Sequence, residues 1–174
     1  HMKSEVIIPI TKVLLNEYDN SSGHCYRISK EYLWIDTANK ISTMSTCFRK
    51  KVGAVITNSN MNKIISIGYN GDEKGGNNQC DSHEVGNCGC LHAEVNCIAQ
   101  AKVDLLNCVI FVSVAPCKMC SKLIINSGIK KVIYYHNYRT LDGIKLLAKR
   151  DVEVVSYKQL CETENEINIE FSDI

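Results

Sequence analysis

Between residues 109 and 155 the chain alternates three short apolar runs with two segments of helical length. The apolar runs are rich in β-branched residues, which is typical of buried strands. Pro116 stands where the first intervening helix should begin, and Gly128 stands where it should end. Because strand–helix–strand units pair in parallel with right-handed crossovers, this alternation predicts a parallel sheet. The strands are expected at 109–114, 131–135 and 152–155, and the second helix at 141–149.

The first half of the chain predicts a hairpin and a helix. Two apolar runs, 52–56 and 63–67, flank the polar segment 58–60, which is typical of a β-hairpin. Ser29 is a suitable N-cap for a helix that ends near Ser45. Added to the parallel strands, the hairpin predicts an α/β fold: a three-layer α/β/α sandwich with a mixed five-stranded sheet.

The length and charge of the chain limit its possible functions. Its 174 residues suit one compact domain, which we place at 29–174 after an N-terminal extension at 1–28. The leading His1-Met2 pair is typical of the remnant of a cleaved affinity tag. A formal net charge of +1 argues against stable binding of nucleic acid. No apolar run reaches the roughly 18 residues of a membrane span, and no signal-peptide pattern opens the chain.

Ten cysteines are the most unusual feature of the composition. In a small secreted protein they would indicate a disulfide framework. Here they cluster around histidines, and several lie in segments that read as regular α/β structure. This distribution favours metal ligation in a reducing compartment, so we expect a cytoplasmic protein that binds metal.

Two short motifs carry the predicted chemistry. The first is His92-Ala93-Glu94 at the start of an expected helix, and the second is the Pro-Cys-Lys-Met-Cys run from Pro116 to Cys120. Together they match the H-x-E…P-C-x-x-C signature of zinc-dependent nucleobase deaminases. A C-x-x-C pair alone would also fit a redox pair or half of a structural zinc site, so the interpretation depends on the joint occurrence.

The spacing within the motifs suits a catalytic zinc site. Cys117 and Cys120 are three residues apart in a first helical turn, so both sulfurs can reach one ion. His92 would be the third ligand, which leaves the fourth tetrahedral position for a water molecule that zinc activates. Glu94 is too near His92 along the chain to ligate the same ion comfortably. It suits a proton shuttle between water, the ring nitrogen and the departing ammonia.

From Cys47 to Val155 the chain resembles the deoxycytidylate (dCMP) deaminases of the cytidine deaminase-like superfamily. Besides the two motifs, the resemblance rests on the run 47–56, the Gly-Tyr-Asn-Gly turn at 68–71 and the passage 124–134. It implies zinc-dependent deamination of dCMP to dUMP and ammonia, which supplies dUMP for thymidylate synthesis. It also implies a homo-oligomer, often a hexamer.

The same resemblance implies residues that contact the nucleotide. Asn70 and Ala93 would contact the substrate, with Asn70 at the sugar or phosphate end. Arg49 and Tyr138 would be candidates for reaching the 5′-phosphate. Arg49 could equally be a solvated charge in the basic run 49–51, and Tyr138 a surface aromatic residue. Asn70 could merely turn the chain, since asparagine before glycine favours turns.

A second group of potential ligands lies just before the first motif. Some phage-type dCMP deaminases carry an additional structural zinc with ligands from these regions. The resemblance places Cys47, Cys80 and Cys90 at or beside those ligand positions, with His83 or Cys88 as the fourth ligand. A closed four-ligand site would stabilise a long loop with little apolar material of its own. The alternative is a set of free cysteines.

The sequence leaves related activities open. Cytidine, dCTP or cytosine in nucleic acid would undergo the same chemistry, whereas a catalytically silent zinc-binding assembly module would have no need of Glu94. Regulated family members respond to dCTP and dTTP, with magnesium expected only alongside such an allosteric nucleotide. The family often has proline soon after the Asn-Gly turn, but this chain has none at 71–75, so regulation stays open.

Overall fold

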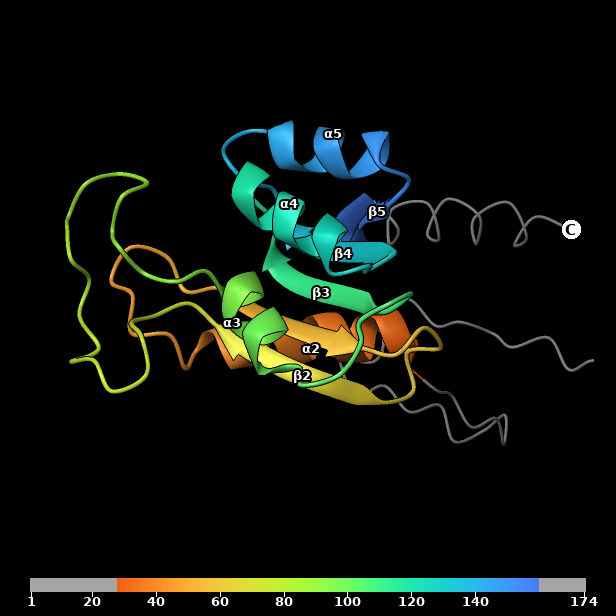
Figure 1. Cartoon of the computed structure of the whole chain (residues 1–174), viewed down its shortest axis with the longest axis horizontal. Coiled ribbons are helices and arrows are strands. Elements are labelled where there is room, and N and C mark those ends of the chain that lie inside the picture. The colour runs from red at the N-terminus through yellow and green to blue at the C-terminus, as the bar shows by residue number, and fades with distance from the viewer. Residues whose placement is uncertain (1–27, 160–174) are drawn as a thin grey trace, which may run out of the picture.

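The computed structural model describes residues 28–159 and arranges them in three layers (Figure 1). The middle layer is a five-stranded sheet with the strand order β2-β1-β3-β4-β5. The strands are β1 (Gly53–Thr57), β2 (Ile64–Tyr69), β3 (Val109–Val114), β4 (Lys131–His136) and β5 (Glu153–Ser156). The sequence patterns therefore predicted the strands to within two residues at each end.

The sheet is mixed, which confirms the prediction. β1 pairs antiparallel with both β2 and β3, so that Val55 lies between Ile67 and Phe111. β3, β4 and β5 are parallel neighbours, and their carboxyl ends lie along one edge of the sheet. Because β1 and β3 have neighbours on both sides and helices over both faces, all their residues are buried. The loops that follow β3 and β4 therefore start side by side.

The outer layers of the described part are formed by the helices α2 (Lys30–Ser42), α3 (Ala93–Gln100), α4 (Lys118–Asn126) and α5 (Asp142–Lys149). α2 covers one face, where Ile35 packs with Phe111 in one buried cluster. On the other face, Cys97, Ile124 and Leu147 bring α3, α4 and α5 into a second cluster. Helices on both faces confirm the three-layer α/β/α sandwich (Figure 1).

Capping residues define most of the helix boundaries. The Ser29 hydroxyl accepts a 3.1 Å hydrogen bond from the N–H three residues later, which confirms Ser29 as the N-cap of α2. Gly128 follows α4 with a φ of +81°, in the left-handed region that favours glycine. α2 ends at Ser42 and not near Ser45. The hydroxyls of Ser42 and Thr43 donate to carbonyls three residues earlier, which competes with continuation of the helix.

A long loop, residues 70–91, extends from the end of β2 and returns to α3 (Figure 1). Hydrogen bonds in both directions between Gly71 and Leu91, at 3.1 and 2.8 Å, close its base. The closure holds the residue after Leu91, the motif histidine His92, close to the end of β2. The loop is therefore anchored directly beside the first residue of the predicted site.

Two predictions concern the domain boundary and membrane spanning. The division into an extension at 1–28 and a domain from 29 stays a prediction, since residues 1–27 and 160–174 lie outside the described part. Within residues 28–159 no helix has the length and apolar character needed to cross a bilayer.

Candidate active site

The starts of α3 and α4 bring the two sequence motifs together. His92 is the N-cap residue of α3, and Cys117 is the N-cap residue of α4. Gly68 allows α3 to lie directly on β2, because a Cβ at this position would overlap with the carbonyl oxygen of Ala93 and the backbone nitrogen of Cys97. Two helix N-termini therefore meet at one place, where their free N–H groups favour negatively charged groups.

The three predicted metal ligands converge on one point. The Nδ1 atom of His92 lies 3.3 Å from the Sγ of Cys120 and 3.5 Å from the Sγ of Cys117. All three ligand atoms lie within 4.8 Å of one another. One imidazole and two thiolates are a donor set that suits zinc, which prefers tetrahedral nitrogen and sulfur ligands. Three protein ligands leave one position open, as in catalytic zinc sites.

Hydrogen bonding shifts the pKa values of the Cys117 and Cys120 thiols in opposite directions. The hydrogen bond from the Cys120 thiol, aided by His92, lowers the pKa of Cys117 to about 3. Its hydrogen bond to Cys117, together with burial, raises the pKa of Cys120. The hydrogen bond with Cys117 also raises the pKa of His92. The group thus contains a thiolate held by neighbouring protons, and a metal cation would take the place of those protons.

Glu94 lies in the first turn of α3, and its side chain is buried with 3% exposure. Burial raises the pKa of its carboxyl group, whose other contacts include a hydrogen bond with the Cys120 thiol. The carboxyl group lines the same cavity as His92 and Cys117. A buried carboxyl group with a raised pKa can accept and release a proton during a reaction.

Two of the three candidate metal ligands, His92 and Cys117, lie in the wall of a cavity of about 430 Å³. This volume is within the usual range for small-molecule sites. Segments that are far apart in the sequence contribute to its wall, including the segment before β1, the long loop and the segment after β4. The wall contains all the residues predicted to contact substrate: Arg49, Asn70, Ala93 and Tyr138.

Comparison with known proteins identifies the family. Residues 28–136, which include both motifs, match the family described as the cytidine and deoxycytidylate deaminase zinc-binding region. The chain belongs to this family. It is 34% identical to the deoxycytidylate deaminase of Homo sapiens over 140 residues, which are 71% of this chain and 75% of the human protein.

Other relatives extend the comparison within the deaminase family. One similar structure is the crystal structure of dCMP deaminase from the cyanophage S-TIM5 in complex with dCMP and dUMP. Its sequence is 34% identical to this chain, and the two folds superpose with a TM-score of 0.64. The match covers 72% of this chain and 95% of the phage chain. The deoxycytidylate deaminase of Schizosaccharomyces pombe is 30% identical over 138 residues, 71% of this chain. That match covers 42% of the yeast protein, so the chain spans less than half the length of this relative.

In this chain, Asn70 connects the end of β2 to the segment that precedes β1. Its Oδ1 accepts a 2.7 Å hydrogen bond from the Val52 N–H, and its Nδ2 donates a 2.8 Å hydrogen bond to the Lys50 carbonyl. The side chain is buried at 7% exposure. Because an amide nitrogen has two hydrogens, one donor is left over from these contacts. Asn70 therefore shapes the cavity, and it retains a donor that could reach a ligand.

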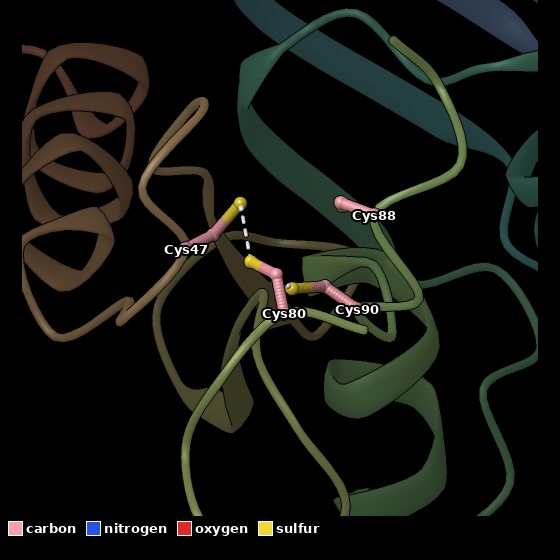
Figure 2. A group of neighbouring side chains, drawn as sticks. All are labelled: Cys47, Cys80, Cys88 and Cys90. Carbon is pink, nitrogen blue, oxygen red and sulfur yellow. Dashed lines mark hydrogen bonds between the residues drawn. The ribbon is translucent and has the colours of Figure 1, made fainter. Parts of the chain in front are cut away.

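A second group of potential metal ligands lies beside the first, formed by Cys47, Cys80, Cys88 and Cys90 (Figure 2). We call it the four-cysteine cluster. Its four sulfurs lie within 4.8 Å of one another. The Sγ of Cys80 lies 3.7 Å from that of Cys47 and 3.4 Å from that of Cys90. Four thiols at one point are the donor set of a closed structural zinc site.

The sequence left the fourth member of this cluster open between Cys88 and His83. The sulfur of Cys88 lies within the cluster. The ring of His83 is exposed and packs at 4.6 Å against the ring of Phe48. Burial alone would raise the pKa of Cys47, but backbone hydrogen bonds from residues 49 and 50 and the neighbouring thiols lower it to about 7. The cluster therefore already favours one thiolate near neutral pH.

The cavity wall contains three further polar residues that were not predicted from the sequence: Lys50, Asn137 and Arg139. Asn137 and Arg139 follow β4, next to the loop after β3 that carries Cys117. Ligand sites in open α/β sheets commonly lie outside the carboxyl ends of parallel strands. Applied to the predicted order of β3 and β4, this rule would have directed attention to residues 137–139.

Proposed function

We propose that this protein hydrolyses the 4-amino group of deoxycytidine monophosphate, giving dUMP and ammonia. The observation that carries the proposal is the convergence of the ligand atoms of His92, Cys117 and Cys120 on one point. The buried carboxyl group of Glu94 lines the same cavity as His92 and Cys117. The human relative is a deoxycytidylate deaminase, and the cyanophage S-TIM5 relative is a dCMP deaminase in complex with dCMP and dUMP. These relatives support the choice of nucleotide.

His92, Cys117 and Cys120 would hold a zinc ion through Nδ1 and two sulfurs. Zinc, when bound, acts as a Lewis acid that activates a water molecule for attack on the pyrimidine ring. The starts of α3 and α4 favour the thiolate form of the cysteine ligands, since both helix dipoles present their positive ends here. The chain would thus provide a cation site with one open position beside the cavity.

Glu94 would move the protons of the reaction. Its carboxylate accepts a proton from the attacking water and delivers it to ring nitrogen N3 as the water oxygen bonds to C4. It then carries the second water proton to the amino nitrogen, and the C4–N4 bond breaks to release ammonia. Water supplies one oxygen and two protons, so the cytosine ring becomes uracil without an oxidant or reductant. Burial keeps solvent from competing for these protons.

The cavity wall would hold the rest of the nucleotide. Asn70 and Ala93 would contact the sugar and base, and Arg49 and Tyr138 would face the phosphate group. The four-cysteine cluster would bind a second, structural zinc, because its four sulfurs lie within 4.8 Å of one another. Three of its members also belong to the cavity wall: Cys47, Cys88 and Cys90. A metal in this cluster would fix that wall to the long loop.

An isotope experiment tests the reaction type directly. The purified protein, loaded with zinc, is incubated with dCMP in water enriched in ¹⁸O, and the product is analysed by mass spectrometry. We expect dUMP that carries one solvent oxygen at O4 and an equal amount of ammonia, since water is the nucleophile. The enzyme boiled before use is the control. Absence of dUMP, or dUMP without solvent oxygen, would contradict the proposed function.

A further inference from the structure

The turn formed by Pro116 and Cys117 places one of the candidate metal ligands. Cys117 is the N-cap residue of α4 and follows the buried Pro116 in the loop after β3. Just before the turn, the N–H of Ala115 donates a 2.8 Å hydrogen bond to the carbonyl oxygen of His136, the last residue of β4. This bond fixes the loop to the sheet, but it leaves the peptide groups of the turn itself to be held by other contacts.

α5 contacts this turn through its second residue, Gly143. α4 and α5 lie side by side on one face of the sheet, with Ile124 and Leu147 in the same buried cluster (Figure 1). Gly143 is also buried. A Cβ at this position would overlap with the carbonyl oxygen of Pro116 and would lie 3.0 Å from the carbonyl carbon of Cys117. The backbone of α5 therefore lies directly against the two peptide groups of the turn.

Space, and not backbone conformation, explains the glycine at position 143. Among the described residues, the glycines with a positive φ are at positions 75, 86, 89 and 128. Position 143 is not one of them, so its backbone conformation suits other residues as well. Alanine is also a better helix former than glycine. Glycine at this position is therefore explained by the close approach of α5 to the turn.

Ser121 contacts the same turn from within α4. Its side chain is buried, and its hydroxyl group donates a 2.9 Å hydrogen bond to the carbonyl oxygen of Cys117. The Ser121 N–H donates to the same oxygen, also at 2.9 Å. A Cβ at Gly143 would lie 2.7 Å from the Ser121 Oγ. Gly143 and Ser121 thus hold the carbonyl group of Cys117 between the two helices.

We propose that Gly143 and Ser121 are positioning residues for the catalytic metal site, because they set the place of the Cys117 sulfur through its peptide group. Neither residue lines the cavity or is a potential ligand, so both act through Cys117. The inference rests on the metal site of the proposed function. Metal sites need ligand distances within about 0.2 Å of the usual values. A Cβ at Gly143 must displace backbone atoms of the turn or of α5, and a displaced turn takes the sulfur outside this tolerance.

Cobalt binding tests the placement of the ligands without turnover. Co²⁺ takes the same ligands as zinc, and its thiolate absorption bands distinguish a site with two thiolates from a site with four. The zinc-free protein is titrated with Co²⁺ in competition with a chelator of known affinity. Gly143→Ala is expected to weaken binding at the two-thiolate site by about 10- to 100-fold, the usual effect of disturbing the groups that orient a metal ligand. Ser121→Ala, which adds no atoms, should weaken it by about 3- to 10-fold, the size of one lost hydrogen bond.

Each variant has a matched control. Gly71 is also buried and pairs with Leu91 beside the first motif, but a Cβ there would meet the Thr46 Oγ1 at an ordinary 3.8 Å. Gly71→Ala should therefore bind Co²⁺ normally. The hydroxyl group of Ser127 likewise donates to a carbonyl oxygen of α4, at 2.8 Å, but at the far end of the helix. Ser127→Ala should also leave the cobalt affinity unchanged.

Added zinc provides a second readout. With dCMP as substrate, excess zinc should restore part of the kcat that Gly143→Ala loses, because the variant binds the ion more weakly. A protein that had lost its fold would not respond to zinc.

The outcomes separate a positioning role from a purely structural one. If α5 moves and the turn does not, Gly143→Ala lowers Tm but keeps the cobalt affinity and spectrum of the unmodified protein, which would overturn the inference. If Gly143→Ala does not fold, Ser121→Ala decides, and normal cobalt affinity in that variant would overturn it as well.

The two proposals also fail in different ways. An unmodified protein that binds Co²⁺ at the two-thiolate site but releases no ammonia from dCMP would disprove the proposed function alone. Turnover of dCMP together with normal cobalt affinity in both variants would leave the function in place and disprove the positioning role.

Discussion

Glu94→Gln is expected to lower kcat for dCMP by about 10²- to 10⁴-fold, the usual contribution of a positioned general acid–base group. Glutamine has nearly the same shape and can stay in the first turn of α3, but it cannot accept a proton from water. The side chain is buried, and burying a neutral amide costs less free energy than burying a charged carboxylate. The substitution should therefore not weaken the fold. The loss should therefore appear in kcat and not in the thermal stability.

Three measurements separate this effect from damage to the site. The Glu94→Gln protein should keep the zinc content and the Tm of the unmodified protein, and it should still bind dUMP. Glu73→Gln, at an exposed position of the long loop, is the control and should keep full activity. Near-normal kcat in the Glu94→Gln protein would contradict the mechanism, because no other carboxyl group among the described residues lines the cavity.

Cys80→Ser is expected to reduce the zinc content from two ions per chain to one and to lower Tm. Cys80 belongs to the four-cysteine cluster but not to the cavity wall, so its loss acts on the loop and not directly on the substrate. Structural zinc contributes its binding energy to folding. If several kcal/mol are lost, Tm should fall by about 5–15 °C, at about 2–4 °C per kcal/mol for a chain of this size.

Cys108→Ser provides the matched control for this prediction. Cys108 is buried just before β3 and lies outside both groups of potential ligands. Its replacement should leave the zinc content at two ions per chain, as measured by atomic emission, whatever its effect on Tm. A Cys80→Ser protein with two tightly bound zinc ions, or an unmodified protein with one, would show that the four-cysteine cluster is a set of free thiols.

The strands and the first group of metal ligands could be predicted from the sequence because each depends on local patterns. Runs of β-branched residues mark buried strands in any context. The spacing of Cys117 and Cys120 within one helical turn puts their sulfurs together before any tertiary contact is known. The end of α2 was predicted less well, because the hydroxyls of Ser42 and Thr43 compete locally with the helix.

Contacts made across the fold were harder to predict. Nothing near Arg139 in the sequence marks it, since a single arginine between a strand and a helix is common on protein surfaces. Only the parallel pairing of β3 and β4 brings it to the same edge as Cys117. The hydrogen bonds of Asn70 to Lys50 and Val52 likewise depend on the pairing of β1 with β2. Residues such as these can be assigned to the cavity only when the strand order is known.

The most direct test of the central claim is the rate of ammonia release by the purified zinc-loaded protein across six compounds: cytosine, cytidine, deoxycytidine, CMP, dCMP and dCTP. The cavity, with its zinc ligands, Glu94 and basic wall, predicts the highest kcat/KM for dCMP, with deoxycytidine at least about 10-fold lower for want of the phosphate. A higher kcat/KM for cytidine or deoxycytidine than for dCMP would contradict the proposal that the enzyme selects a nucleoside monophosphate. No ammonia release from any of the six compounds would contradict the proposed deaminase function.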